Sequence, residues 1–433
     1  MRRPPDRRRK SAHPPRTVPP ARPLTLGVDA LGAGGDGVAL HAGVRHFVPL
    51  ALAGETVVAV PRAQTSEGVA CSLSAVEAPS PERVAPFCPV FGRCGGCSLQ
   101  HWADAPRAAW KRQRVVTALG HRGFVDPEVL PTRVCPVDTR RRATLALTGK
   151  KLGFRESAGH TVVAIDACPI LVPELSRLIA PLRDVLAPIT DAASVAMTWT
   201  DTGADVVVRA DADLGWEARE ALGGFANAHD LARFAWDAGD GPVPMAVARN
   251  PAMRFGGVAV GFPAASFLQP SAEGEALLRD EVLAGLGDAP KVADLFCGLG
   301  TFALPIAAHA AQVFAADADG AAVQALQTAV AANRLGSVVT VAARDLFRDP
   351  LIAAELDAFD AVVFDPPRAG AQAQARQIAV SGVGLVVAVS CNPASFARDA
   401  RILVDGGFTI AQVVPVDQFP TNAHLELVAV LRR

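Results

Sequence analysis

The sequence predicts a multidomain protein with a small N-terminal β-barrel, an α+β central domain and a C-terminal Rossmann-like α/β domain. The chain has 433 residues, which is more than one domain usually holds. Residues 24–80 contain short strand-like runs separated by glycines. From Lys291 onward, apolar strand-like runs alternate with amphipathic helical runs, which is typical of a mostly parallel, doubly wound sheet.

The first element is a basic arm, residues 1–23. It has a formal net charge of +7 and is rich in Arg and Pro, so we expect it to be disordered. A solvated tail and an electrostatic tether to RNA explain its charge equally well. No hydrophobic run follows the basic residues, which argues against a secretory signal, and we expect a cytoplasmic location.

The second element covers residues 24–80, where strand-like runs and their turns predict a barrel. Small barrels of this kind often bind oligonucleotides, although the shape alone does not define a function. We expect residues 81–265 to form the central domain and residues 266–433 to form the C-terminal domain. The strand-like runs of the barrel begin near Val38, Val44, Glu55 and Val69.

Charge is distributed unevenly over these domains. The whole chain has a formal net charge of −1, which taken alone argues against binding to nucleic acid. Residues 1–175 nevertheless sum to +10, and the remaining residues sum to −11. We therefore expect only the N-terminal part to contact a polyanion.

One segment, Leu295–Ala316, has no Lys, Arg, Asp or Glu and is long enough to raise the question of a membrane span. Its glycines and Pro305 divide it into a strand, a loop and a helix. We interpret it as buried α/β core and expect no contact with a membrane.

The central domain contains a group of closely spaced cysteines. Cys88, Cys94 and Cys97 are followed, much later in the chain, by Cys168. Small residues between the thiolates suit a metal ion or an Fe–S cluster, whereas disulfides fit poorly without a secretory signal. Zinc also accepts four thiolates, but its structural sites usually pair two short CxxC units. The solitary Cys168 therefore favours a 4Fe-4S cluster, and its four ligands leave no iron open for chemistry.

The C-terminal domain carries acidic residues at the ends of successive predicted strands. The first strand leads into a Gly-rich turn, Asp294–Phe302, where a nucleotide-like ligand can approach the backbone. Asp317, Asp345 and Asp365 follow the next three strands and would face the same crevice. Asp317 suits a ribose diol, and Asp345 suits an adenine amino group. The Asp-Pro-Pro turn at Asp365 favours S-adenosylmethionine over NAD, because dinucleotide sites do not use such a turn.

Two further residues point to catalysis. The fifth predicted strand ends at Ser390–Pro393, which places Cys391 at the same edge of the sheet. Positive backbone ends there would lower the pKa of its thiol, and we expect a covalent role beside a methyl-donor pocket. Glu426 lies between two leucines, which would raise its pKa and let it act as a base. Taken alone, its segment favours a strand residue that faces solvent.

Together, these motifs resemble those of the RNA uracil-5 methyltransferases, most closely the branch that methylates 23S ribosomal RNA and carries a 4Fe-4S cluster. The resemblance covers nearly all of the chain after the arm. It implies that residues 24–80 form an OB-like TRAM barrel and that the last domain is a methyltransferase domain. The matching segments are Phe91–His101, Ile165–Pro169, Ser266–Pro270, Asp294–Phe302, Phe364–Arg368, Ser390–Pro393 and His424–Glu426.

The resemblance also implies roles for single residues. Cys391 would add to C6 of the uracil, C5 would take the methyl group from S-adenosylmethionine, and Glu426 would remove the C5 proton. The target uridine has to leave its stack to reach such a pocket. The implied cofactor contacts are Gln269, Phe296, Thr301, Asp317, Asp345 and Asp365, and the implied cluster ligands are Cys88, Cys94, Cys97 and Cys168.

Three alternatives remain open. Enzymes that methylate the T-loop uridine of tRNA use the same chemistry but generally lack the barrel and the four-cysteine cluster. Adenine amino-methyltransferases share Asp-Pro-Pro, but an aromatic residue usually stands where this chain has Arg368, and they need no Cys391. A non-catalytic Fe–S RNA-binding protein would need neither Cys391 nor Glu426. We expect 23S rRNA as the partner of a monomer that has no obligate protein partner.

Overall fold

The computed structural model describes residues 16–17, 22–157 and 159–433, so most of the predicted basic arm lies outside the described residues. The chain folds as two compact units, one of Met1–Pro86 with Ser98–Ala103 and one of Phe87–Cys97 with Asp104–Arg433. Within the described ranges, no helix is long and apolar enough to cross a membrane.

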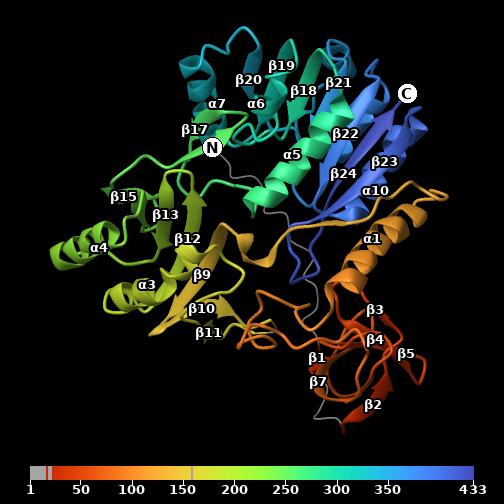
Figure 1. Ribbon diagram of the computed structural model, residues 1–433, viewed down its shortest axis with the longest axis vertical. Helices are drawn as coiled ribbons and strands as arrows, with labels where there is room; N and C mark the ends of the chain where they lie inside the picture. Colours follow the sequence, from red (N-terminus) through yellow and green to blue (C-terminus); the bar gives the residue numbers. More distant parts are fainter. Residues whose placement is uncertain (1–15, 18–21, 158) are drawn as a thin grey trace, which may run out of the picture. The chain divides into compact units, whose positions relative to one another are not determined.

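The N-terminal unit is a curved sheet that closes on itself (Figure 1). The segment of β2 and β3 pairs with β6 through Leu24–Gly27 and with β4 through Ala30–Leu31. This segment therefore closes the sheet by linking β6 and β4, the two ends of the strand order β6-β7-β5-β4. Leu26, Val48 and Val57 are buried inside the closed sheet. The strands are β1 Arg16–Thr17, β2 Leu24–Gly27, β3 Ala30–Leu31, β4 Gly37–His41, β5 Val44–Val48, β6 Thr56–Gln64 and β7 Val69–Ala78.

The central part of the larger unit is a mostly antiparallel sheet in the order β11-β10-β9-β12-β13-β14-β15. Helices cover one face, where Leu182, Leu222 and Phe234 join one apolar core. Its elements are β9 Arg142–Thr148, β10 Lys151–Arg155, β11 Val162–Ala164, α2 Pro173–Ser176, α3 Ile179–Leu186, β12 Ala192–Thr200, β13 Gly203–Arg209, α4 Trp216–Ala228, β14 Arg233–Asp237 and β15 Val243–Val247. Between this sheet and the C-terminal domain lies the hairpin of β16 Ala252–Phe255 and β17 Val258–Gly261.

The C-terminal domain confirms the predicted doubly wound α/β fold. Its sheet has the order β20-β19-β18-β21-β22-β24-β23-β8, and the pairs from β20 to β22 are parallel. The order reverses direction between β18 and β21, which is the place where such folds bind ligands. The strands are β18 Lys291–Leu295, β19 Gln312–Asp317, β20 Val339–Ala343, β21 Ala361–Phe364, β22 Leu385–Ser390, β23 Thr409–Asp417, β24 Glu426–Arg432 and β8 Arg133–Val134.

Both faces of this sheet are covered, so its central strands are mostly apolar. On β22, Val387 packs into the core under α5, while Val386 packs into the core under α1 and α10. Figure 1 shows α5 across β22 and β24, and Gly285 permits this approach because a Cβ there would lie 2.8 Å from Val430. The helices are α1 Asp104–Gly120, α5 Ala272–Leu286, α6 Ala303–Ile306, α7 Gly320–Ala332, α8 Ala353–Leu356, α9 Gln372–Ala379 and α10 Pro393–Asp405.

Two elements of the predicted central segment, residues 81–265, belong physically to the C-terminal domain. Val115 and Leu119 of α1 are fully buried in the same core as Leu403 of α10. Strand β8 pairs with β23 and extends the sheet by one strand. The sequence contains no sign of this pairing, because it joins a two-residue strand to a partner almost three hundred positions away.

Candidate functional site

The predicted site residues meet at one edge of the C-terminal sheet. Parallel register aligns Leu295 with Ala316 on one side and with Phe364 on the other, so the residues after these three strands share an edge. On the far side, Ser390 pairs with Leu427, which places Cys391 beside the start of β24. The edge therefore gathers Asp294, Asp317, Asp365, Cys391 and Glu426.

The turn after β18 is built for close approach of a ligand. Phe296 has a φ of 64°, a left-handed conformation that a non-glycine residue rarely adopts, and Gly298 and Gly300 also have positive φ. The backbone N–H of Gly298 donates to Asp317 Oδ2 across 2.9 Å. Thr301 is half-buried just before α6. The glycines leave room that side chains would fill, which fits the predicted cofactor site.

Asp294 provides an independent sign that this edge takes a cationic or hydrogen-donating ligand. Among the described residues, neither carboxyl oxygen has a close hydrogen-bond partner, although the side chain is buried. Burial and the negative charges of Asp365 and Asp317 raise its pKa well above the ordinary value, and the nearby N–H of Ala303 only moderates this effect. Methyl donors of the sulfonium class carry positive charge and match such a site.

Gln269 is placed beside Asp365 although it comes from the segment before α5. Its Nε2 donates to Asp365 Oδ2 across 3.2 Å, and its Oε1 accepts from Gln418 Nε2 across 3.1 Å. Burial and the charge of Asp317 raise the pKa of Asp365 to about 7, and the bond from Gln269 opposes this rise. Asp365 therefore changes charge close to neutral pH.

Arginines from the central domain hold the segment that carries Gln269. Arg141 Nε donates to the carbonyl of Gln269 across 3.1 Å, and the same guanidinium forms a 2.5 Å ion pair with Glu275 of α5. Arg142 Nη1 donates to the carbonyl of Leu268 across 2.8 Å. Phe267, two-thirds exposed, lies under the Arg142 guanidinium at 5.0 Å from its ring centre.

The protonation of Cys391 differs from the expectation based on the sequence. Its pKa is raised to about 11, not lowered, because burial and the charges of Glu426 and Asp365 outweigh the opposing effect of Arg368. Glu426 is buried, which excludes the solvent-facing alternative. Burial and the charge of Asp365 raise the pKa of Glu426 well above its ordinary value, as predicted.

Asp345 lies in the turn after β20. Its Oδ1 accepts from the N–H of Phe347 across 3.1 Å, and its carboxylate lies 3.5 Å from Arg348. These contacts form a capped turn after β20. The ring of Phe347 lies 5.4 Å from that of Phe296, which links this turn to the glycine turn.

The cysteines of the predicted cluster come together from distant segments. The negative charges of Cys97, Cys94 and Cys88 act on Cys168, and with burial as the main cause they raise its pKa to about 11. Within the described residues, no set of three or more His, Cys, Asp or Glu side chains is close enough to hold a single metal ion. All eight cysteines lie in the described ranges.

Two polar contacts near the site were not predicted from the sequence. Lys111 of α1 is fully buried and lies 2.5 Å from Asp417 at the end of β23. Arg368 Nη2 lies 2.8 Å from His424 Nδ1, two residues before Glu426. The Asp-Pro-Pro-Arg turn and the His-Leu-Glu segment each belong to a motif, but nothing in the sequence pairs them.

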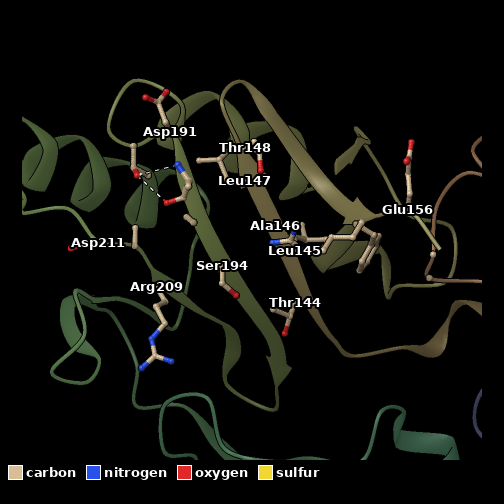
Figure 2. A pocket seen from close by; sticks show the side chains of 18 of the residues that line it. Thr144, Leu145, Ala146, Leu147, Thr148, Glu156, Asp191, Ser194, Arg209 and Asp211 are labelled. Atoms are coloured by element: carbon tan, nitrogen blue, oxygen red, sulfur yellow. Dashed lines mark hydrogen bonds between the residues drawn. The ribbon is translucent and has the colours of Figure 1, made fainter. Parts of the chain in front are cut away.

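A hollow of about 1070 Å³ lies elsewhere, over β9 and β12 of the central sheet. Figure 2 shows Thr144, Ala146 and Ser194 on its floor. Basic and acidic side chains are mixed around it, so it offers no excess of positive charge to RNA. The charged lining residues are Arg155, Glu156, Asp191, Arg209 and Asp211.

Comparison with known proteins agrees with the geometry. The tRNA (Uracil-5-)-methyltransferase family model matches residues 259–433. An uncharacterized RNA methyltransferase of Brucella suis is 44% identical over 413 residues, which cover 94% of this chain and 97% of that protein. The 23S rRNA (uracil(1939)-C(5))-methyltransferase RlmD of Alkalilimnicola ehrlichii is 33% identical over 96% of this chain and 97% of its own length.

A solved structure extends the likeness to the fold. The Pyrococcus abyssi tRNA (uracil-54, C5)-methyltransferase in complex with S-adenosyl-L-homocysteine matches with a TM-score of 0.75 and 25% identity. The match covers 94% of this chain and 99% of that one. Fold, acidic edge and matches together define an S-adenosylmethionine-dependent methyltransferase. The chain belongs to the family of RNA uracil-5 methyltransferases.

Proposed function

We propose that this enzyme methylates C5 of a specific uridine in 23S ribosomal RNA through a covalent Cys391–uracil adduct. The observation that carries the proposal is that Cys391, directly after β22, lies beside Glu426, the first residue of the adjacent strand β24, where the charge of Glu426 acts on the thiol. C5 of uracil is too weak a nucleophile to attack a sulfonium methyl group unaided. A nucleophile for C6 and a base for the C5 proton solve this problem together.

The proposed reaction balances with these two side chains. The Cys391 thiolate forms a bond to C6, and the C5–C6 π electrons move to C5 as an enolate. S-adenosylmethionine, when bound, supplies the methyl group that C5 takes. Glu426 then accepts the C5 proton, the electrons of that C–H bond restore the double bond, and the Cys391 thiolate leaves.

The cofactor would be held at the switch point of the sheet. Phe296 and Thr301 flank the open glycine turn, and Asp317 contacts that turn directly. Gln269 would orient Asp365, whose charge acts on the thiol of Cys391. Asp345 would contribute through the turn that contacts Phe296.

Ribosomal RNA is favoured by the match to the Alkalilimnicola ehrlichii enzyme, which spans nearly the whole chain. The N-terminal barrel supports an OB-like TRAM assignment, because its closed pairing order suits an oligonucleotide-binding barrel.

We place a structural 4Fe-4S cluster at Cys88, Cys94, Cys97 and Cys168. Burial lowers the pKa of Arg140, and the charges of Cys97 and Cys168 oppose this change, so its guanidinium would offset the negative charge of such a cluster.

Methylation of the T-loop uridine of tRNA is the second candidate. It is favoured by the match to the Pyrococcus abyssi enzyme, which covers 94% of this chain. A tRNA enzyme can therefore share almost this entire architecture. The argument that tRNA enzymes lack the barrel and the cysteine segment does not separate the two substrates.

The test uses purified full-length protein, labelled S-adenosylmethionine, and transcripts of 23S rRNA and of tRNA. Wild-type enzyme should label a single class of site in 23S rRNA and form a covalent adduct with 5-fluorouridine RNA. Cys391→Ala should lose both, whereas Cys71→Ala, which removes a buried thiol from the N-terminal unit, should retain both. Full methylation by Cys391→Ala would overturn the covalent route. Labelling of tRNA alone would overturn the assignment to rRNA.

A further inference from the structure

The contact between Arg368 and His424 fixes the protonation of the imidazole. A guanidinium only donates hydrogen bonds, so at 2.8 Å from Arg368 Nη2 the Nδ1 atom of His424 has to be the acceptor. The ring proton is therefore assigned to Nε2, and the imidazole is neutral. Partial burial and the positive charges around it lower the pKa of His424 to about 4, in line with this state. Those charges belong to Arg368, Lys111, Arg140 and Arg114.

His424 is held by contacts other than the one with Arg368. Its backbone N–H donates to Asn422 Oδ1 across 2.9 Å, and its ring lies edge-on to Phe419 at 5.5 Å between centres. Arg114 of α1 donates to the carbonyl of Ala423. The loop that leads into Glu426 is thus anchored before it meets Arg368.

Arg368 is anchored next to the nucleophile. Asn392, the residue after Cys391, donates from Nδ2 to the carbonyl of Arg368 across 3.0 Å. The Asn392 Oδ1 atom caps α10 by accepting from the N–H of Ala394. The charge of Arg368 reaches both reactive groups, because it lowers the pKa of Cys391 and of Glu426 against the larger effects of burial and neighbouring carboxylates.

We propose that Arg368 and His424 form a positioning pair, in which neutral His424 holds the guanidinium where its charge favours the thiolate of Cys391. This inference rests on the proposed role of Cys391 as the nucleophile. Loss of the thiol proton creates a negative charge beside Glu426 and Asp365. A guanidinium held in place reduces this repulsion, whereas an untethered one prefers water. Protonation of His424 would turn its Nδ1 into a donor and release Arg368.

The test measures alkylation of Cys391 by iodoacetamide as a function of pH, without RNA or cofactor. The tryptic peptide 377–398 contains Cys391 as its only cysteine, so mass spectrometry reports this thiol alone. Arg368→Gln should raise the pH midpoint by about one unit and slow alkylation about tenfold below the midpoint. His424→Ala should shift the midpoint in the same direction. His424→Asn offers an acceptor oxygen in place of Nδ1 and should restore the wild-type profile.

Arg401→Gln is the matched control, because it removes the same charge from α10 and leaves the peptide 377–398 intact. A wild-type midpoint in Arg368→Gln or in folded His424→Ala would overturn the proposal. Equal shifts in His424→Asn and His424→Ala would reduce His424 to a packing role and also overturn it. The assay is independent of methyl transfer. If Cys391→Ala still methylates RNA while Arg368→Gln shifts the pH midpoint of Cys391 alkylation, the proposed function is wrong. The positioning of Arg368 by His424 would then still be supported.

Discussion

The amide of Gln269 donates to the carboxylate of Asp365 across 3.2 Å and joins the segment before α5 to the turn after β21. Asp365 needs this partner because it lies close to other acidic groups at the sheet edge, and its pKa is raised to about 7. Arg141 fixes the backbone of Gln269 at the same time. One central-domain arginine therefore helps to set the electrostatics of the catalytic edge.

Asp365→Asn should change the pH dependence of stability. A carboxyl with a raised folded pKa destabilises the native state as pH rises from about 4 through about 7, and asparagine has no such dependence. The variant should therefore gain stability relative to wild type across this window, by at most about 4 kcal/mol. Urea unfolding at several pH values measures the gain. Asp405→Asn, at the exposed end of α10, is the control, and equal pH profiles for wild type and Asp365→Asn would contradict the prediction.

Glu426→Gln should allow the bond between Cys391 and the uracil to form but block release of the methylated RNA. Glutamine is close in size but cannot take the C5 proton, so the methylated uracil should stay bonded to Cys391. A denaturing gel and mass spectrometry of the protein–RNA product would detect the trapped adduct on ordinary RNA. Glu273→Gln, at an exposed position of α5, should release product normally. Rapid release of methylated RNA by Glu426→Gln would remove Glu426 as the base.

The arrangement of the C-terminal sheet was predictable because its buried parallel strands are continuous apolar runs. The run at Ala361–Phe364 became β21 with the same bounds. The sequence did not predict the barrel segment that contains β2 and β3. Both strands are short, and β2 pairs with β6 whereas β3 pairs with β4. The helix expected within Leu295–Ala316 is regular only over Ala303–Ile306, because the chain has to turn before it enters β19.

The positions of the site residues followed from strand order, but their protonation did not. The low pKa expected for Cys391 was inferred only from its position between its own strand and the following helix. The opposing charge of Glu426 comes from β24, which pairs with β22 in antiparallel fashion and could not be placed from local sequence. The contact between Arg368 and His424 joins residues 56 positions apart for the same reason.

Gly300→Ala should damage the glycine turn. Gly300 has a φ of 87°, and a Cβ there would lie 2.6 Å from Leu326 Cδ1. Backbone strain and overpacking together should cost about 1–3 kcal/mol of unfolding free energy. Calorimetric titration with S-adenosylhomocysteine should show weaker binding. Gly320→Ala is the matched control, because no atom lies within 4 Å of its Cβ position and alanine suits a helix. Equal binding and stability in both variants would contradict the prediction.

The cysteine set should bind iron and not zinc. Protein purified without oxygen should be brown and contain about four iron and four sulfide ions per chain. Cys168→Ser should lose this colour, because Cys168 is the one proposed ligand outside the short segment that carries Cys88, Cys94 and Cys97. Cys71→Ala should keep it, and circular dichroism would show whether either variant is unfolded. One zinc ion in a colourless wild-type protein would contradict the prediction, because zinc also accepts four thiolates.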